Sequence, residues 1–300
     1  MDFRQIEAFV YVVRFNSFSK AADAIFLTQP TVSSHISSLE NELGVKLLDR
    51  SGKEVEPTSA GKIFYDYANN LVNIRDQAVF TLSEFSHKVE GKVELAASTV
   101  PAEYILPGLI IGFRNKYGSI SFSVDQFDSD QVINGLLEKK YEIGFVGTMI
   151  ENSKLDYHKL ANDRLVLAAP CNKKFSSVGS EAIPFELIKD ESFIYRETGS
   201  GTRKEFEKIL LGNGIDPSTI HIAARFNSID AIKQSVSRGL GVSIMSYVSI
   251  EDYVRFVQIK AFDIEGFDLN RAFYMVTHKK RPLSPVNSAF LDYVKESCSK

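Results

Sequence analysis

The chain has 300 residues, which is too long for one small hydrophobic core, so we expect two or three folding units. Hydrophobic residues make up 44% and charged residues 24%, as in soluble globular proteins, and a formal net charge of −3 excludes a general attraction to polyanions as the basis of function. The sequence begins directly in a helical pattern without a secretory signal, and no apolar run reaches the roughly 18 residues of a membrane span, so we expect a cytoplasmic protein with no membrane partner.

The first predicted element is a helix over residues 3–14. Ile6, Phe9, Val10 and Val13 recur at helical spacing and mark its buried face. We expect this helix to supply the core of a small N-terminal domain.

Residues 17–48 predict two further helices joined by a tight turn. Ser19 is the expected N-cap of the first, because its hydroxyl can accept a free backbone N–H. Thr28 is expected to begin the second, with Pro30 in its first turn, where the missing N–H costs nothing. The apolar residues of the second helix form a stripe that should face the core: Val32, Ile36, Leu39 and Leu43.

The opposite face of this second helix carries short polar side chains. Its members are Thr31, Ser33, Ser34, His35 and Ser38. A recognition helix needs small hydrogen-bonding side chains, because its first turns must lie close to the base edges of DNA. An ordinary helical hairpin with a solvated face is the alternative, and a lone histidine such as His35 is usually just a surface residue.

A polar turn at residues 49–53 follows the helices. Val55 and Pro57 are expected to return as a short strand, which makes a wing, with Arg50 and Lys53 as contacts to DNA phosphates. Thr58 or Ser59 is then expected to cap a new helix.

The first 65 or so residues resemble the LysR-type transcriptional regulators. The motifs that carry the resemblance are S-F-S-x-A-A (17–22), T-Q-P-T-V-S (28–33), I-x-x-L-E (36–40), L-G-V-x-L-L-x-R (43–50) and T-S-A-G (58–61). The resemblance implies a winged helix-turn-helix DNA-binding domain at 1–58, a dimerising linker helix at 59–90 and an effector-binding domain at 91–300. The residues expected to contact DNA are Ser19, Gln29, Pro30, Thr31, Ser33, Ser34, His35, Ser38, Arg50 and Lys53.

The charge of this N-terminal region argues against a simple basic footprint. Residues 1–60 contain six Lys and Arg and eight Asp and Glu, a formal sum of −2. Ser34 and His35 also lie where many family members carry an arginine, so base preference and affinity stay open.

Residues 59–89 predict one long helix, since no Gly or Pro follows Gly61. Its apolar stripe comprises Phe64, Tyr67, Ala68, Leu71, Ile74, Ala78, Leu82 and Phe85. Pairing with a second copy of the chain would bury this stripe. The alternative is a helix buried against the C-terminal domain.

Strands and helices alternate from Glu90 onward, which predicts a mostly parallel sheet with helices on both faces. The family resemblance implies an α/β domain of two lobes like periplasmic binding proteins, so the overall class is α+β. Lobe I is expected at about 91–162 and 268–300 and lobe II at about 163–267, with strands near 163–168 and 262–276 crossing between them.

Small polar residues follow several of the predicted strands. In open α/β sheets ligands bind at such strand ends against helix N-termini. The candidate effector-binding residues are Ser98, Thr99, Thr148 (after Gly147), Arg196, Gly199, Ser200, Gly201, Thr202, Asn227 and Ser228. Each Ser, Thr or Asn is also a plausible N-cap. The G-S-G-T-R run favours a small anionic effector, because Arg196 and Arg203 add charge to backbone that can approach closely.

The sequence therefore predicts a sequence-specific regulator of transcription, dimeric or tetrameric, that binds double-stranded DNA and a small anionic effector. RNA polymerase is a further candidate partner. The R-E-x-G-S-G-T-R string resembles a subgroup tied to sulfur, selenium or carbon assimilation. The alternative is a solute-binding or enzymatic C-terminal domain with a non-functional head.

No cofactor, metal or enzymatic activity is expected, because neither H-E-x-x-H nor G-x-S-x-G occurs and Cys171 and Cys298 lack metal-ligand spacing. Cys171 could serve as a redox sensor, but an ordinary thiol is favoured.

Overall fold

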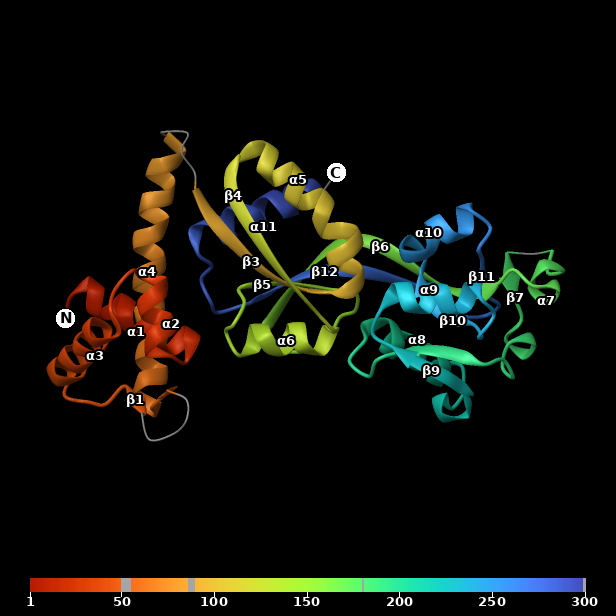
Figure 1. Ribbon diagram of the computed structural model, residues 1–300, viewed down its shortest axis with the longest axis horizontal. Coiled ribbons are helices and arrows are strands. Elements are labelled where there is room, and N and C mark those ends of the chain that lie inside the picture. The colour runs from red at the N-terminus through yellow and green to blue at the C-terminus, as the bar shows by residue number, and fades with distance from the viewer. Residues whose placement is uncertain (50–54, 86–89, 180, 299–300) are drawn as a thin grey trace. The chain divides into compact units, whose positions relative to one another are not determined.

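The computed structural model describes residues 1–49, 55–85, 90–179 and 181–298 (Figure 1). Residues 1–91 with 280–289 form one structural unit, and residues 92–279 with 290–300 form the other. None of the described helices is both long and apolar enough to cross a membrane.

The first unit begins with three short helices. These are α1 (Phe3–Phe15), α2 (Phe18–Ala24) and α3 (Gln29–Leu43), and they are followed by β1 (Leu48–Asp49), β2 (Glu56–Pro57) and the long α4 (Ser59–Phe85). β1 and β2 pair antiparallel, with Leu48 opposite Pro57, so the predicted wing is present. The helix-turn-helix prediction is confirmed in its element order.

The sequence predicts the N-cap of α3 correctly but not that of α2. The hydroxyl of Thr28 accepts the backbone N–H of Thr31 at 3.4 Å, which confirms Thr28 as the N-cap of α3. The cap of α2 is Ser17 rather than Ser19, because Ser17 accepts the N–H of Lys20 at 3.3 Å. The helix begins two residues early because Asn16, at φ 49°, reverses the chain directly after α1. Ser19 consequently lies exposed in the first turn of α2.

The core of the first unit joins α1, α3 and α4. Its buried side chains include Ile6, Phe9, Val10, Val32, Ile36, Leu39, Ala68 and Val72. Phe9 packs against Phe64 with ring centroids 5.3 Å apart. The predicted stripe of α3 ends one turn early, since Leu43 next to the left-handed Gly44 is 37% exposed.

Helix α4 has two apolar faces rather than one stripe. Tyr65, Ala68 and Val72 are buried against the rest of the unit. The other face leaves large apolar side chains exposed: Ile63, Tyr67, Leu71, Ile74, Val79 and Leu82. The sequence prediction had mixed the two sets, because both recur with helical spacing.

The second unit begins with β3 (Glu90–Ser98), a π-helical turn (Pro101–Ile105), α5 (Leu106–Lys116), β4 (Ser119–Phe127), α6 (Ser129–Leu137) and β5 (Ile143–Val146). A 16-residue strand, β6 (Leu155–Pro170), follows. Next come α7 (Lys173–Ser176), β7 (Ala182–Ile183), β8 (Phe193–Arg196), α8 (Gly201–Gly212), β9 (Ile222–Phe226) and α9 (Ile229–Ser237). The chain continues with β10 (Ser243–Ser246), α10 (Tyr247–Arg255), β11 (Ile259–Ile264), β12 (Asn270–His278) and α11 (Pro285–Cys298).

The sheet order is β4-β3-β5-β12-β6-β11-β7, with β10 also on β6 and β8-β9 as a separate pair. The prediction of a mostly parallel sheet is wrong. β3 is parallel to β5, β7 to β11 and β8 to β9, but β12 is antiparallel to β5 and β6, and β10 and β11 are antiparallel to β6. The local alternation of elements did not reveal this, because β6 and β12 run through the domain in opposite directions.

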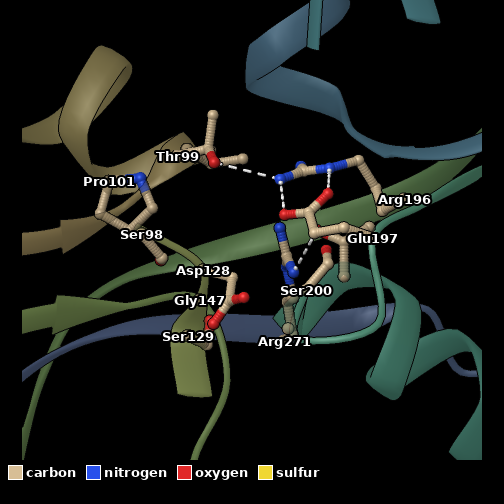
Figure 2. A pocket seen from close by; sticks show the side chains of 13 residues that line it. Ser98, Thr99, Pro101, Asp128, Ser129, Gly147, Arg196, Glu197, Ser200 and Arg271 are labelled. Carbon is tan, nitrogen blue, oxygen red and sulfur yellow. Dashed lines mark hydrogen bonds and ion pairs between the residues drawn. The ribbon is translucent and has the colours of Figure 1, made fainter. Parts of the chain in front are cut away.

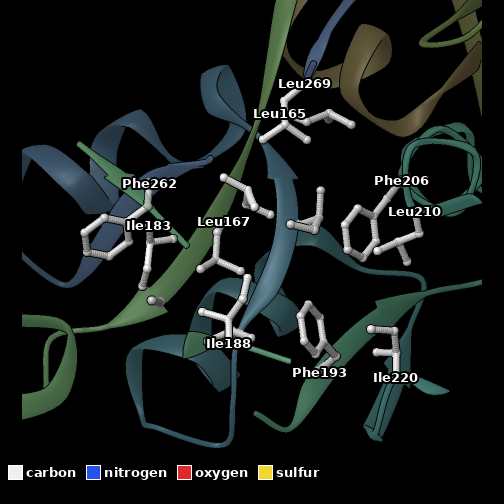
Figure 3. Close-up of a cluster of buried hydrophobic side chains, with 14 of the residues drawn as sticks. Leu165, Leu167, Ile183, Ile188, Phe193, Phe206, Leu210, Ile220, Phe262 and Leu269 are labelled. Carbon is white, nitrogen blue, oxygen red and sulfur yellow. The ribbon is translucent and has the colours of Figure 1, made fainter. Parts of the chain in front are cut away.

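Strand β6 serves two halves of the unit. Residues 155–164 pair with β12, and residues 165–170 pair with β10 and β11. We call the half with β3–β5, α5 and α6 lobe I, and the half with β7–β11 and α7–α10 lobe II. Each lobe has its own buried cluster, and that of lobe II includes Leu165, Leu167, Phe193, Phe206 and Ile244 (Figure 3). The exact domain and lobe limits given above stay predictions.

Candidate functional site

A cavity that is partly open to solvent lies between the two lobes (Figure 2). It is lined by Ser98, Thr99, Val100, Pro101, Asp128, Ser129 and Gly147 of lobe I, by Arg196, Glu197, Ser200, Gly201 and Thr202 of lobe II, and by Arg271 on β12. Strand ends and helix starts therefore meet here, as expected for an open α/β sheet.

Helix N-termini face the cavity from both lobes. Asp128 caps α6 by accepting the N–H of Gln131 at 2.8 Å, in a capping box. Ser200 caps α8 by accepting the N–H of Arg203 at 3.5 Å. Both helices direct the positive end of their dipoles at the site, which favours an anion there.

The first charged group of the cavity is Arg196, the last residue of β8, which is 7% exposed. Its Nη2 donates to the hydroxyl of Thr99 at 3.0 Å, so it contacts lobe I from lobe II. Its Nε and Nη2 donate to the two carboxylate oxygens of Glu197, each at 2.8 Å. This is the two-point geometry with which a guanidinium binds an oxyanion.

The second charged group is Arg271, which the sequence analysis missed. Its Nε donates to Asp163 at 2.6 Å and its Nη1 to Thr202 at 2.9 Å. Its Nη2 is buried and has no hydrogen-bonding partner among the described residues. Burial lowers the pKa of Arg271 and nearby Arg196 adds to this, while Asp163 opposes it. An arginine stays protonated under such conditions, so a side chain that lines the cavity carries an unsatisfied donor on a cation.

The two lobes touch closely beside the cavity. Thr148 donates to Glu205 at 2.9 Å, and Lys204 forms an ion pair with Asp130. A Cβ on Gly199 would lie 2.2 Å from a carboxylate oxygen of Asp128, and one on Gly201 would lie 2.8 Å from Thr148 Cγ2. These two glycines allow an approach that no other residue permits.

Eight of the ten predicted effector residues are gathered around this cavity. Ser98, Thr99, Arg196, Ser200, Gly201 and Thr202 line it, and Thr148 and Gly199 lie beside it. Asn227 and Ser228 are exposed and do not line it, and the hydroxyl of Ser228 caps α9 by accepting the N–H of Ala231. The effector-binding role of all ten residues stays a prediction.

The lining residues with polar side chains that sequence reasoning did not select are Asp128, Ser129, Glu197 and Arg271. Asp128 had a detectable signal, the D-x-x-Q capping box before a helix. Arg271 had none, because it lies 69 residues beyond Thr202 and reaches the cavity only through the pairing of β12 with β6.

Seven of the predicted DNA-contact residues lie on α3, and Ser19 lies on α2. Gln29, Pro30, Ser34 and Ser38 are exposed, and Thr31, Ser33 and His35 are partly exposed. Ser19 donates to the side chain of Gln29 at 2.8 Å, which fixes the amide at the start of α3. Arg50 and Lys53 lie outside the described residues.

The acidic residues of the first unit are largely engaged by their own chain. Asp2 caps α1, Glu7 pairs with Arg75, and Glu42 pairs with the N-terminal ammonium. The carboxylate of Glu40 is buried and accepts from Lys46, Leu47 and Leu48. Burial alone would raise the pKa of Glu40, but these hydrogen bonds outweigh it and the pKa is lowered.

Comparisons with known proteins cover both units. The family described as "Bacterial regulatory helix-turn-helix protein, lysR family" matches residues 3–62, and "LysR substrate binding domain" matches residues 86–299. The chain belongs to the LysR family of transcriptional regulators. This LysR-type regulator has an N-terminal DNA-binding domain and a C-terminal effector-binding domain, as the sequence predicted.

Relatives of this LysR-type regulator match it over most of its length. The RuBisCO operon transcriptional regulator of Allochromatium vinosum is 30% identical over 295 residues, covering 98% of this chain and 95% of its own. Full-length OxyR from Pseudomonas aeruginosa shares the fold at a TM-score of 0.73 and 18% identity, over 99% of this chain and 94% of its own. The CcmR regulatory domain of Synechocystis, solved with 2-PG, is 26% identical with a TM-score of 0.63, over 70% of this chain and 99% of its own.

Among the described residues, no group of three or more His, Cys, Asp or Glu side chains is placed to hold a metal ion. Cys171 is exposed and Cys298 is partly buried, and neither forms a disulfide.

Proposed function

We propose that a small anionic effector binds the cavity between lobes I and II of this LysR-type regulator and thereby controls its action on DNA. The observation that carries the proposal is the buried Nη2 of Arg271, which has no partner among the described residues and belongs to a side chain that lines the cavity. A buried donor without a partner costs free energy, and an oxyanion would satisfy it. The similar regulatory domain of CcmR was solved in complex with 2-PG, which supports a small-molecule effector for this domain type.

Through the contacts between the lobes, an effector can change how the two lobes are arranged. Thr99–Arg196, Thr148–Glu205 and Asp130–Lys204 join the lobes around the cavity. An effector that binds the closed arrangement better than an open one would shift the balance between them. Such a shift would alter the spacing of paired DNA-binding domains.

The proposed DNA contacts are side chains of α3 and its flanks. Gln29, Thr31, Ser33, Ser34 and Ser38 would address the major groove and its flanking phosphates, with Ser19 positioning Gln29. Pro30 and His35 lie on the same face, and Arg50 and Lys53 are proposed as phosphate contacts from the wing. RNA polymerase is a further proposed partner.

Self-association is proposed through the exposed apolar face of α4. A second copy is a suitable partner, because Ile63, Tyr67, Leu71 and Ile74 of that face recur at intervals of three and four residues, as in helical pairing. We propose a dimer or a tetramer, in the compartment that contains the DNA. The targets are proposed to include assimilation genes, which the RuBisCO operon relative supports.

The test is genome-wide mapping of DNA fragments bound by the protein. Discrete peaks that share a pseudo-palindromic site are expected, and the neighbouring genes would nominate effectors for titration. Absence of enrichment, with and without candidate anions, would contradict DNA-binding control and favour a ligand-binding or enzymatic C-terminal domain with an inactive head. A variant with Ser34 changed to Ala is expected to reduce enrichment at those sites, and Asn41→Ala, on the exposed side of the last turn of α3, is the matched control.

A further inference from the structure

The carboxylate of Glu197 binds the guanidinium of Arg196, which is the group that an anionic effector would bind. We propose that Glu197 is a built-in counter-ion of Arg196, which the effector displaces by presenting its own carboxylate, phosphate or sulfate group. This inference rests on the proposed function, because it concerns the same cavity. It restricts the effector to ligands with an oxyanion that can bind a guanidinium at two points.

The geometry of the pair is that of a bound ligand. Glu197 directly follows Arg196 in the chain, yet its two oxygens accept separately from Nε and Nη2, each at 2.8 Å. Both residues line the cavity, and Figure 2 shows the carboxylate inside it, with Arg271 entering from below. An external oxyanion at this place would make the same two hydrogen bonds.

The two members of the pair differ in how firmly they are placed. Arg196 is buried and also donates to Thr99, so its guanidinium cannot leave the cavity without losing that bond. The Glu197 side chain is 24% exposed, and Arg196 is its only side-chain partner among the described residues. Rotation of Glu197 into water therefore breaks nothing except the contacts that the effector replaces.

The charges of the cavity explain why an internal counter-ion is useful. Arg196 and Arg271 both line the site, and of these two arginines it is Arg271 that donates to the carboxylate of Asp163. Without Glu197, a nearly buried guanidinium would lack a counter-charge, which is strongly unfavourable. The effector-free protein is stabilised by Glu197, and binding becomes an exchange of one anion for another.

The exchange also explains selectivity. A neutral ligand cannot replace Glu197, because it would leave Arg196 without a counter-charge. An oxyanion gains one donor that Glu197 leaves unused, the Nη2 of Arg271. Oxyanions with three or four oxygens are favoured, since they can reach both guanidinium groups.

The experiment compares the full-length protein with its Glu197→Gln variant. Binding of inorganic phosphate is measured by isothermal titration calorimetry at constant ionic strength. Gln retains the size of the side chain but removes the competing charge, so we expect phosphate to bind about tenfold more tightly. Glu207→Gln is the matched control, because Glu207 forms a similar ion pair with Arg203 on α8 and does not line the cavity. It should bind phosphate like the unmodified protein.

Three further results decide the matter. Equal, weaker or absent phosphate binding by Glu197→Gln overturns the inference. Arg196→Lys removes the two-point site and should abolish phosphate binding in either background, and if it changes nothing, phosphate binds elsewhere and the assignment of the cavity itself fails. If Glu197→Gln loses its cooperative thermal transition, Glu197→Asp serves instead. Its side chain is one methylene shorter and brings the carboxylate less close to Nε and Nη2 of Arg196, so this variant should also bind phosphate more tightly.

Discussion

The carboxylate of Glu40 accepts a 2.8 Å hydrogen bond from the backbone N–H of Leu47, seven residues further along the chain. The same oxygen accepts the N–H of Leu48 at 3.2 Å, where β1 begins. A side chain near the end of α3 thus fixes the segment that leads into the wing. The buried carboxylate supplies the hydrogen-bond acceptor that these two backbone amides would otherwise lack.

Replacing Glu40 with Gln is expected to destabilise the first unit by about 1–3 kcal/mol, since a charge-assisted acceptor is lost and a buried amide group must find partners. Urea unfolding monitored by circular dichroism measures the change. Glu56→Gln, an exposed residue of β2, is the control and should shift stability by less than about 0.5 kcal/mol. A loss equal to that of the control would show that the Glu40 contacts are unimportant.

The pH dependence of this effect has a defined sign. The folded-state pKa of Glu40 is lowered, so its stabilising contribution is fully present above the unfolded pKa of about 4.3 and disappears as the pH falls through the folded value. The stability difference between the unmodified protein and Glu40→Gln should therefore be constant from pH 8 to about pH 6 and shrink at acidic pH. A difference that grows on acidification would contradict the lowered pKa.

Local patterns were sufficient for the elements of the first unit but not for its buried polar contacts. Thr28 and Pro30 indicate the start of α3, and the spacing of Val32, Ile36 and Leu39 predicts its buried face. The buried contacts of Glu40 could not be predicted, because nothing in the sequence near it shows that the chain returns after Gly44 to present two amides.

The effector cavity was predictable only in part, for a similar reason. Ser98, Thr99 and Ser200 to Thr202 follow strands, a local signal. Arg271 and Asp163 meet because β12 pairs with β6 at long sequence separation, and the direction of that pairing is set by the tertiary fold rather than by neighbours in sequence.

Exposed apolar residues of α4 provide a test of self-association. Ile74 is 67% exposed, and changing it to Glu would place a charge in the proposed helix pair. We expect the dimer to dissociate about 30-fold more readily, as for a residue central to an interface. Sedimentation equilibrium measures this, with Gln77→Glu, an exposed polar position of the same helix, as the control. Unchanged association would exclude this face.

The Asp163–Arg271 pair should be essential to the stability of the second unit. Both side chains are less than 5% exposed, and Asp163 also accepts from Ser246 at 2.7 Å. Asp163→Asn leaves a buried guanidinium without its counter-charge, so we expect a loss of about 3–5 kcal/mol by urea unfolding. Glu251→Gln, in a surface pair with Arg255, should cost less than about 1 kcal/mol. Comparable losses in both variants would contradict the special role of the buried pair.

Thr99 is expected to act on the effector through Arg196. Thr99→Val removes the acceptor for Nη2, so the guanidinium loses its contact with lobe I, and we expect phosphate to bind about tenfold more weakly. DNA binding without effector should persist in an electrophoretic mobility assay. Thr219→Val removes a hydroxyl that bonds Asp216 outside the cavity, and it should leave both measurements unchanged. Loss of DNA binding together with phosphate binding would point to a folding defect.

Gly201 allows the two lobes to approach each other closely. A methyl group there would lie 2.8 Å from both Ser129 Oγ and Thr148 Cγ2, so Gly201→Ala must separate these residues from the start of α8. We expect a cost of about 1–3 kcal/mol for the arrangement seen here and a corresponding loss of phosphate affinity, because the cavity is built from both sides of this contact. Small-angle scattering should detect a wider mean separation of the lobes. Gly212→Ala, at the other end of α8 with open space around it, is the control and should leave affinity unchanged. Retained affinity in Gly201→Ala would show that the effector does not require the close approach of the lobes.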